Sequence, residues 1–393
     1  MSTTAFLSRG FRPFFLGAAV YAVVGMSAWM AVFLFSYPIQ LQGVSIFQWH
    51  AHEMVFGYSM AVIAGFLLTA TWNWTGQRTA DGLFLALLFL PWLLARVLML
   101  GGTALITWAT LFDLAFMLGL GVAIARPIIR KRQSRQAPIL LLLVLLASAR
   151  LLFFLGAEGL LADGARISVH GGLYLVLGMV LFMGRRVIPF FTQRGVGYEV
   201  TPRNDRWNDL ATLAVYPLFA LSEILLPYHL LGALLAALLL LLNTLRVLGW
   251  HTVGIWQRPL LWGLFIAVVM INLGFMLRAL MPVTAIPALL PVHAYAVGGI
   301  GIITVSMMAR VTLGHTGRNV HRAPPVMGLL LTGMLAAATI RIFLPLIDPD
   351  RYIFWIGAAG AAWIASFLLF LLVFAPMLIS RRADEDKNRD QDS

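Results

Sequence analysis

Residues 47–71 read FQWHAHEMVFGYSMAVIAGFLLTAT, and in this stretch only Glu53 carries a formal charge. About 20 mostly apolar residues are what an α-helix needs to cross the hydrocarbon core of a bilayer. Similar apolar runs recur along the chain of 393 residues, of which 61% are hydrophobic and 11% charged. A soluble domain is nearer half apolar and about a quarter charged. The sequence therefore predicts an all-α, polytopic membrane protein.

Twelve transmembrane helices are predicted from these runs, because Gly, Pro, Asn and charged residues separate them. The predicted spans are 13–35, 47–71, 83–100, 104–126, 138–157, 167–189, 208–226, 229–248, 259–280, 288–309, 325–345 and 352–378. Together they form one predicted transmembrane domain, residues 1–380. A charged tail, residues 381–393, follows and is expected in the cytoplasm.

The net charge of +12 comes mainly from Arg and Lys in the short connections between the apolar runs. With the N-terminus inside, most of the 28 Lys and Arg residues fall on the inner side, as the positive-inside rule requires. Both termini are therefore expected in the cytoplasm. The positive net charge is thus explained by the topology of the chain in a lipid bilayer, and no nucleic acid partner is predicted.

The chain contains no cysteine. This excludes disulfides, iron–sulfur clusters and thiolate-ligated zinc or haem. The remaining side chains that could ligate a metal are histidines, carboxylates and the 17 methionines.

Histidines lie near the predicted outer ends of three spans: His50 and His52 on the second, His170 on the sixth and His293 on the tenth. A histidine inside a membrane helix is costly and usually functional, so these positions suggest a buried metal or haem centre. Residues two apart on a helix point about 200° apart, so His50 and His52 would face different neighbours, with Glu53 on the His50 face. Interfacial histidines at helix starts are the alternative.

Glycines follow two of these histidines, Gly171-Gly172 after His170 and Gly298-Gly299 after His293. They would leave room for a flat group such as a porphyrin, whose iron takes axial histidine. Glycine pairs in membrane helices also serve close helix packing, which is the alternative.

Four arginines lie near the outer ends of outward-running helices: Arg96, Arg150, Arg278 and Arg341, with Glu223 at a similar depth. Guanidinium groups bind anionic groups such as haem propionates in a bidentate manner. The alternative is that these side chains snorkel to the outer interface.

Another acidic residue, Asp113, lies within the fourth span. We interpret it as a packing residue, with a proton path as the alternative.

Five separated motifs extend over nearly the whole membrane-spanning length: GFRPFFL (10–16), HAHEMVFG (50–57), AGFLLTA (64–70) with NWTG (73–76), GRRVIPFFT (184–192) and RVTLGHTGR (310–318). In these motifs and their order the chain resembles the NnrS family. The resemblance implies a bacterial inner-membrane protein with twelve helices, associated with haem and copper and with resistance to nitric oxide. His315, in the last motif and in a predicted cytoplasmic connection, is a further candidate metal ligand.

The chain is also loosely similar to haem–copper oxidases and their nitric oxide reductase relatives, which hold metals near the outer side on helices two, six, seven and ten. His170 and Tyr174 have the i, i+4 spacing of the oxidase histidine–tyrosine pair. Helix seven has no histidine and the histidine pair is on helix two rather than ten, so a three-histidine copper site is in doubt. Such a similarity of fold does not fix the function.

These features favour a protein that reduces or detoxifies nitric oxide at a b-type haem, with copper as a possible second metal. His50 and His52 would reach two centres, and His293 would be an opposing axial ligand. His170, Glu53 and Tyr174 would flank a site for a small gas, with Glu53 relaying protons. Quinol or a separate donor would supply electrons.

Two other functions are compatible with the same residues. One is a transporter or exporter of haem, a metal or a nitrosyl-iron species, although transporters often have broken helices near the midplane in matched halves. The other is a non-catalytic nitric oxide sensor, which needs the same ligands but no proton path.

Overall fold

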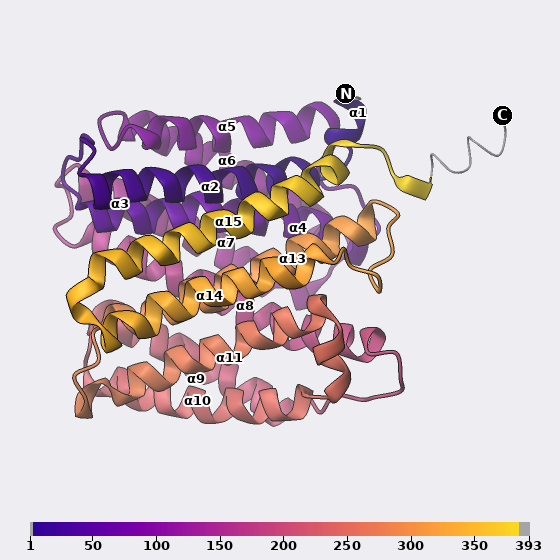
Figure 1. The fold of residues 1–393 in the computed structure, drawn as a ribbon. Coiled ribbons are helices and arrows are strands. Elements are labelled where there is room, and N and C mark those ends of the chain that lie inside the picture. Colours follow the sequence, from indigo (N-terminus) through magenta and orange to yellow (C-terminus); the bar gives the residue numbers. More distant parts are fainter. Residues whose placement is uncertain (1–2, 385–393) are drawn as a thin grey trace. The chain divides into compact units, whose positions relative to one another are not determined.

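The computed structural model describes residues 3–384, and the regular structure of this part of the chain is helical (Figure 1). An isolated bridge pairs Gln40 with Gly102. The predicted all-α class is therefore confirmed. Most of the predicted tail, residues 385–393, lies outside the described residues.

The α- and π-helical elements follow one another along the chain. They are α1 (Thr3–Phe6), α2 (Phe11–Phe35), α3 (Ile46–His52), η1 (Glu53–Ser59), α4 (Met60–Thr75), α5 (Gly82–Leu100), α6 (Ile106–Arg130), α7 (Ala137–Ala157), α8 (Gly164–Gly195), α9 (Arg206–Leu225), α10 (Leu230–Trp250), α11 (Pro259–Leu280), α12 (Leu289–His293), η5 (Ala294–Gly301), α13 (Ile302–His315), α14 (Val326–Ile347) and α15 (Tyr352–Ile379). Short 3₁₀ turns are η2 (Ser134–Gln136), η3 (Val253–Gln257), η4 (Met281–Val283) and η6 (Pro349–Arg351).

Each of the twelve predicted spans corresponds to a helix or to a continuous series of helices. Within the described residues, eleven of these are long and apolar enough to cross a membrane. The twelfth is α9, which is more polar and buries Asp209 and Glu223. The chain is thus a multi-pass membrane protein.

Two predicted spans are each six residues too short at their basic ends. The span predicted at 167–189 continues in α8 to Gly195, and the one predicted at 288–309 continues in α13 to His315. His315 is therefore the last residue of a helix and not part of a connection. The prediction ended these spans close to their arginines, just after Arg185 and Arg186 in one and just before Arg310 in the other. A basic residue near a helix C-terminus instead interacts favourably with the helix dipole.

The chain packs as two compact units, and α8 passes from one to the other after Gly172. Unit 1 consists of Met1–Gly172, Met308–Val320 and Phe367–Ser393. Unit 2 consists of Leu173–Met307 and His321–Ser366. We describe each unit by itself.

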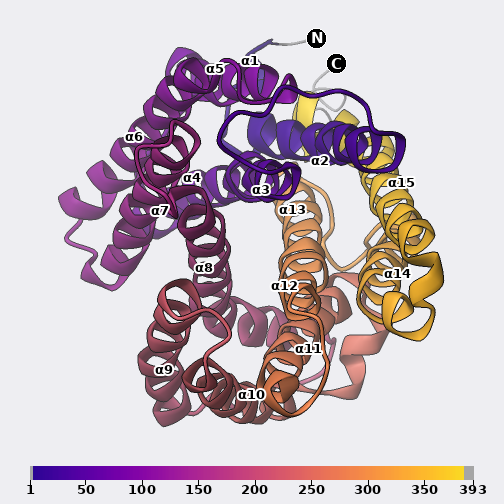
Figure 2. The same cartoon turned by 90° about the vertical axis from the view of Figure 1, so that its left-hand side faces the viewer.

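In unit 1, α3, η1 and α4 form one continuous rod, which packs against α2 and, through α4, against α6 (Figure 2). α1 and the last turns of α15 lie at the same end of this unit (Figure 1), which we call the terminal end. Arg12 links the start of α2 to the end of α15 there. Its NH1 donates to the carbonyl oxygens of Leu378 at 2.9 Å and Ser380 at 2.5 Å.

In unit 2, α10 lies between α9 and α11 (Figure 2), and η5 packs against α11 and α14. A second rod is formed by α12, η5 and the first residues of α13. Each unit therefore contains a rod that changes from α to π geometry and back.

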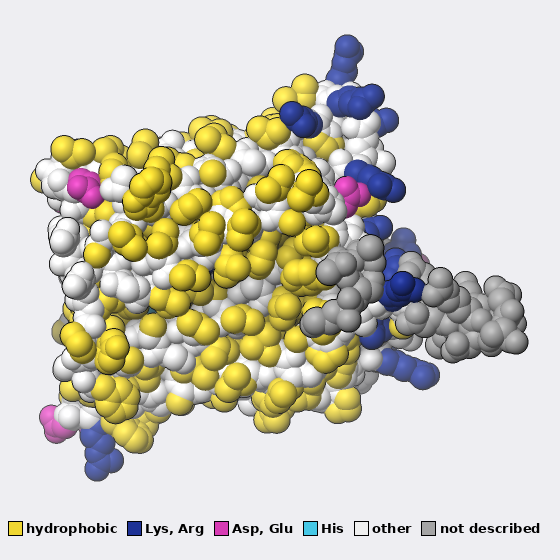
Figure 3. Space-filling model, turned by 90° about the horizontal axis from the view of Figure 1, so that it is seen from above, with side chains coloured by type: hydrophobic (Ala, Val, Ile, Leu, Met, Phe, Trp, Pro, Cys, Tyr) yellow, Lys and Arg dark blue, Asp and Glu magenta, His cyan; other side chains and the backbone are white. Residues whose placement is uncertain are grey.

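The exposed hydrophobic side chains of the surface are those expected for a protein surrounded by lipid. Hydrophobic side chains cover the helices on the face shown in Figure 3, while most of the Lys and Arg side chains of that face gather at one end. In α5, for example, Leu83, Leu87 and Val97 are exposed. A soluble protein rarely exposes apolar patches of more than a few hundred Å².

Candidate functional site

The rod at the centre of the site changes from α to π geometry directly after His52. Residues Glu53–Ser59 form η1, whose backbone hydrogen bonds reach five residues along the chain. Trp92 of α5 donates its indole N–H to the Gly57 carbonyl oxygen at 3.0 Å. Such π-helical turns are rare and frequently occur at functional sites, which directs attention to the side chains around η1.

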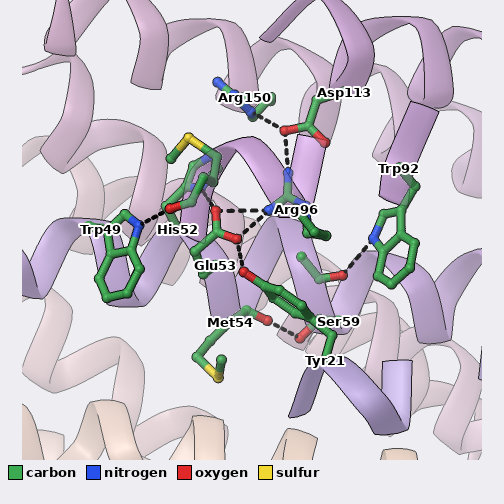
Figure 4. A network of polar contacts seen from close by, with 12 residues as sticks. Tyr21, Trp49, His52, Glu53, Met54, Ser59, Trp92, Arg96, Asp113 and Arg150 are labelled. Atoms are coloured by element: carbon green, nitrogen blue, oxygen red, sulfur yellow. Dashed lines mark hydrogen bonds and ion pairs between the residues drawn. The ribbon is translucent and has the colours of Figure 1, made fainter. Parts of the chain in front are cut away.

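Glu53, the first residue of η1, accepts hydrogen bonds from three side chains (Figure 4). Its Oε1 lies 2.7 Å from His52 Nδ1, and both of its oxygens lie 2.8 Å from Arg96 NH1. The Tyr21 hydroxyl donates to Oε2. Glu53 and His50 both contact α2, through Tyr21 and Trp29, which agrees with the expected shared face. The carboxylate turns in addition to His52, at the point where the π-helix begins.

Asp113 extends this network to a second ion pair. Its Oδ2 lies 2.5 Å from Arg96 NH2 and 2.7 Å from Arg150 Nε. Two carboxylates, Glu53 and Asp113, thus balance two guanidinium groups. Buried charges are tolerated in membranes when they are paired in this way. The interpretation of Asp113 as a packing residue becomes more specific, because it is the ion-pair partner that joins α5, α6 and α7.

His52 is completely buried, and its Nε2 has no hydrogen-bond partner among the described residues. Its ring centroid lies 4.1 Å from that of Phe153 and 5.1 Å from that of Phe56. The Glu53 carboxylate requires the proton on Nδ1, so Nε2 presents a lone pair. A histidine that ligates a metal almost always donates its other ring N–H to such a partner. The donor chemistry of His52 therefore fits a ligand of a metal or of haem iron.

The four predicted arginines differ in their partners. Arg96 pairs with Glu53 and Asp113, Arg278 pairs with Glu223, and Arg341 interacts with Tyr352. Arg150 uses only Nε, and both of its terminal nitrogens are buried without a hydrogen-bond partner in residues 3–384. Because Arg96, Arg150 and Arg278 are buried, snorkelling does not describe them. Arg150 can therefore still bind an anionic group through both terminal nitrogens.

His50 has different surroundings from His52. Its ring stacks on Trp29 of α2, with centroids 4.3 Å apart and an interplanar angle of 21°. The two imidazoles therefore have different neighbours, as the helical spacing predicts.

His170 and His293 each place Nδ1 against their own helix. The Nδ1 of His170 lies 3.0 Å from the Arg166 carbonyl oxygen, and that of His293 lies 2.7 Å from the Leu289 carbonyl oxygen. His293 directly precedes η5, just as His52 directly precedes η1. His170 belongs to unit 1 and His293 to unit 2. In residues 3–384, no three His, Asp or Glu side chains come together as a potential metal site.

The space expected beside the glycines is occupied by neighbouring side chains. A Cβ added at Gly172 would lie 2.8 Å from the Phe56 ring, and one added at Gly298 would lie 2.8 Å from Met270. At Gly299 the nearest atom would be Cγ1 of Ile271, at 2.5 Å. These glycines allow close helix packing, which is the alternative that the sequence left open.

Tyr174, predicted as a catalytic partner of His170, belongs to a second network, in unit 2. Its hydroxyl hydrogen-bonds to Glu223, and its carbonyl oxygen accepts a 2.5 Å bond from Tyr216. Arg278 Nε donates to both Glu223 oxygens, at 2.9 and 2.8 Å. A further carboxylate in unit 2, Asp209, joins two arginines of its own.

His315 lies at the terminal end, where its ring packs 5.7 Å from Phe11. His50 instead packs against Trp29, which lies on α2 like Phe11. Phe11 and Trp29 are 18 residues apart, which corresponds to about 27 Å along α2. His315 therefore cannot share a centre with the histidines of the η1 rod.

The sequence did not identify Tyr21 or Phe153 as members of the site. Both are ordinary residues of apolar spans, and neither has a charge or spacing that would distinguish it from the core. Tyr21 has one weak signal, because a buried tyrosine hydroxyl usually needs a hydrogen-bond partner.

Comparison with known proteins gives the family. No protein of curated function matches the chain. Residues 5–382 match the family described as NnrS protein, and this range covers nearly the whole chain and all five motifs of the sequence. The chain therefore belongs to the NnrS family of membrane proteins, which is linked to the nitric oxide response.

Proposed function

We propose that this protein binds a b-type haem through His52 and that the haem binds nitric oxide. The observation that carries the proposal is the buried Nε2 of His52, which lacks a hydrogen-bond partner among the described residues while Nδ1 is held by Glu53. A haem iron with an open coordination position would bind nitric oxide there.

Glu53 acts in this proposal as a positioning residue. It sets the tautomer and the orientation of the imidazole and increases the basicity of Nε2. Arg96 and Tyr21 also donate hydrogen bonds to the Glu53 oxygens. The carboxylate is therefore held in place and has little freedom to relay protons. This role differs from the proton relay that the sequence suggested.

Arg150 supplies the contact for a negatively charged group. Its two terminal nitrogens, which have no hydrogen-bond partner in residues 3–384, would donate to the two oxygens of a carboxylate such as a propionate. Arg96 and Arg278 already hold protein carboxylates, which makes them structural. Roles of His50, His170 and His293 at a second haem or copper centre, and the bacterial inner membrane as location, stay predictions.

The test measures haem, iron and copper per chain in protein purified from a membrane fraction, with absorption spectra before and after nitric oxide. His52→Ala is compared with His229→Ala, which removes an exposed histidine that caps α10. We expect stoichiometric haem and a nitrosyl spectrum in the wild type and in His229→Ala, and at least a tenfold loss of haem in His52→Ala. Full haem content with an unchanged spectrum in His52→Ala would refute the proposal.

The same preparation separates the three classes of function. Formation of nitrous oxide from nitric oxide with a quinol donor indicates a reductase. A nitrosyl complex without turnover indicates a sensor or sink. Release of haem or nitrosyl-iron across liposomes indicates an exporter.

A further inference from the structure

His315 and the basic residues around it are not used by the haem proposal, although three sequence motifs meet there within unit 1. Phe11 of the first motif packs against the His315 ring. The Asn73 side-chain amide, from the NWTG motif, lies 3.5 Å from His315 Nε2. These segments are distant in sequence, so their convergence is a property of the folded unit.

Arg9 completes this cluster. Its NH1 lies 3.3 Å from His315 Nδ1, and its guanidinium carbon lies 4.6 Å from the centre of the Trp72 ring. Because a guanidinium can only donate, His315 Nδ1 must accept, and the imidazole is neutral. Arg9 is half-buried, yet none of the carboxylates in residues 3–384 pairs with it.

The charge around Arg9 is predominantly positive. Arg78 also faces the Trp72 ring, at 5.9 Å, and has Asp81 as its partner at 3.2 Å. Burial and the nearby charge of Arg382 lower the pKa of Arg9 from its ordinary value, even though Arg382 has Asp384 as a partner. A cation in this position is destabilised by desolvation and like charge, and an anion would relieve both effects.

A metal ion does not suit this cluster. Arg9 lies within hydrogen-bonding distance of the ring nitrogen that would have to ligate the metal, and its positive charge would repel a cation. This geometry argues against His315 as a metal ligand and favours a negatively charged partner.

We propose that Arg9, Asn73 and His315 form a binding site for a phosphate group, that of an anionic phospholipid or of free phosphate. Phosphate has several acceptor oxygens and is a preferred partner of the planar guanidinium. The site lies where three membrane-length helical spans begin or end, since one starts at Phe11, one ends at Thr75 and one ends at His315. Helix ends of this kind lie at the depth of lipid headgroups, where basic residues attract anionic lipids.

Arg12, although adjacent, has a different role. Its NH1 holds the carbonyl oxygens of Leu378 and Ser380 and so fixes the end of α15 beside the cluster. It is therefore not a suitable position for testing the phosphate site.

The experiment uses full-length protein in neutral detergent and measures binding by native mass spectrometry and by the shift in thermal unfolding. One arm adds phosphatidylglycerol, with phosphatidylcholine as the neutral lipid. The other arm adds inorganic phosphate, with chloride at equal ionic strength. Arg9→Gln is compared with Arg130→Gln, which removes the same charge from the exposed last residue of α6.

We expect phosphatidylglycerol or phosphate to bind and to stabilise the wild type and Arg130→Gln. Arg9→Gln should weaken this binding roughly fivefold, because one basic residue near an anionic lipid is worth about 1 kcal/mol. A response to lipid alone identifies the headgroup as the source of the phosphate, and a response to inorganic phosphate identifies the free ion.

Equal losses in Arg9→Gln and Arg130→Gln, or no preference for either phosphate source over its control, would overturn the proposal. Asn73→Ala is the second variant, because Asn73 is exposed and its loss leaves helix packing intact; it should weaken binding in the same direction. Haem content is measured in parallel and should be unchanged, so the two proposals fail independently.

Discussion

Unit 1 and unit 2 each bury a glutamate–arginine ion pair, and each contains a π-helix that begins directly after a histidine. In unit 1 the carboxylate, Glu53, is bound to that histidine. In unit 2 the carboxylate, Glu223, is bound to Arg278 and Tyr174, while His293 bonds to its own helix. Both units thus contain a glutamate–arginine ion pair. In unit 1 the glutamate also binds the histidine that precedes the π-helix.

The comparison shows why a buried charge in a membrane helix is not by itself a functional marker. An arginine and a carboxylate that satisfy each other can simply hold helices together. In unit 1 the same pair also orients an imidazole whose second nitrogen has no hydrogen-bond partner in the described residues. This additional feature distinguishes a candidate ligand site from a structural ion pair.

The largest expected effect is on stability, from Asp113→Asn in unit 1. The substitution leaves Arg96 and Arg150 without their shared carboxylate and should cost about 3–5 kcal/mol of unfolding free energy. Asp209→Asn is the matched control in unit 2, because Asp209 also joins two arginines. Its cost should be smaller, since the Asp209 and Arg185 side chains are 11% and 18% exposed. Unfolding in detergent measures the stability of both variants. Equal losses of unfolding free energy would mean that burial does not distinguish the Asp113 network from the Asp209 network.

The next effect concerns the proposed haem. Glu53→Gln should lower haem affinity by about 10–100-fold, because it removes the charged partner of the ligating histidine. Glu223→Gln changes the corresponding ion pair of unit 2 and should leave haem affinity unchanged. Titration of the apoprotein with haem measures both variants. The distinction between the units would be lost if the two variants weakened binding to the same extent.

The two π-helices should respond differently to an added methyl group. A Cβ at Gly57 of η1 would lie 2.6 Å from the Tyr21 ring and 3.0 Å from Arg96 NH1, both of which are held by Glu53. Gly57→Ala should therefore cost about 1–3 kcal/mol by overpacking. At Gly298 of η5 an added Cβ would lie 2.8 Å from Cβ and Cε of Met270. Gly298→Ala should cost less, because it strains apolar packing alone and displaces no partner of a buried charge. Thermal unfolding of the two variants tests the order, and a larger loss in Gly298→Ala would contradict it.

The smallest effect comes from removing single tyrosine hydroxyls. Tyr21→Phe removes a hydrogen bond to a charged carboxylate and should cost about 1.5 kcal/mol. Tyr216→Phe removes a bond to the neutral carbonyl of Tyr174 and should cost about 1 kcal/mol. The difference is measured by the same unfolding experiment, and a reversed order would show that the Glu53 network tolerates the loss of Tyr21.

Much of the site was visible in the sequence as separate residues. His52, Glu53, Arg96 and Arg150 were identified because ionisable side chains are costly inside a membrane. Their pairing was not, since Glu53 and Arg96 are 43 residues apart and Asp113 and Arg150 are 37 residues apart. The bond between Glu53 and His52 was not predicted for a related reason, because an α-helical spacing does not describe the side chains where a π-helix begins.

By itself the sequence determined the all-α class, the number of helices and which side chains are unusual in a membrane, because hydropathy and charge act over one helix length. Only the tertiary structure decided which arginines are neutralised, that His52 and not His50 is bound to Glu53, and that His315 meets Arg9. The reason is that pairing depends on which helix faces are pressed together. That is a property of packing between segments distant in the chain.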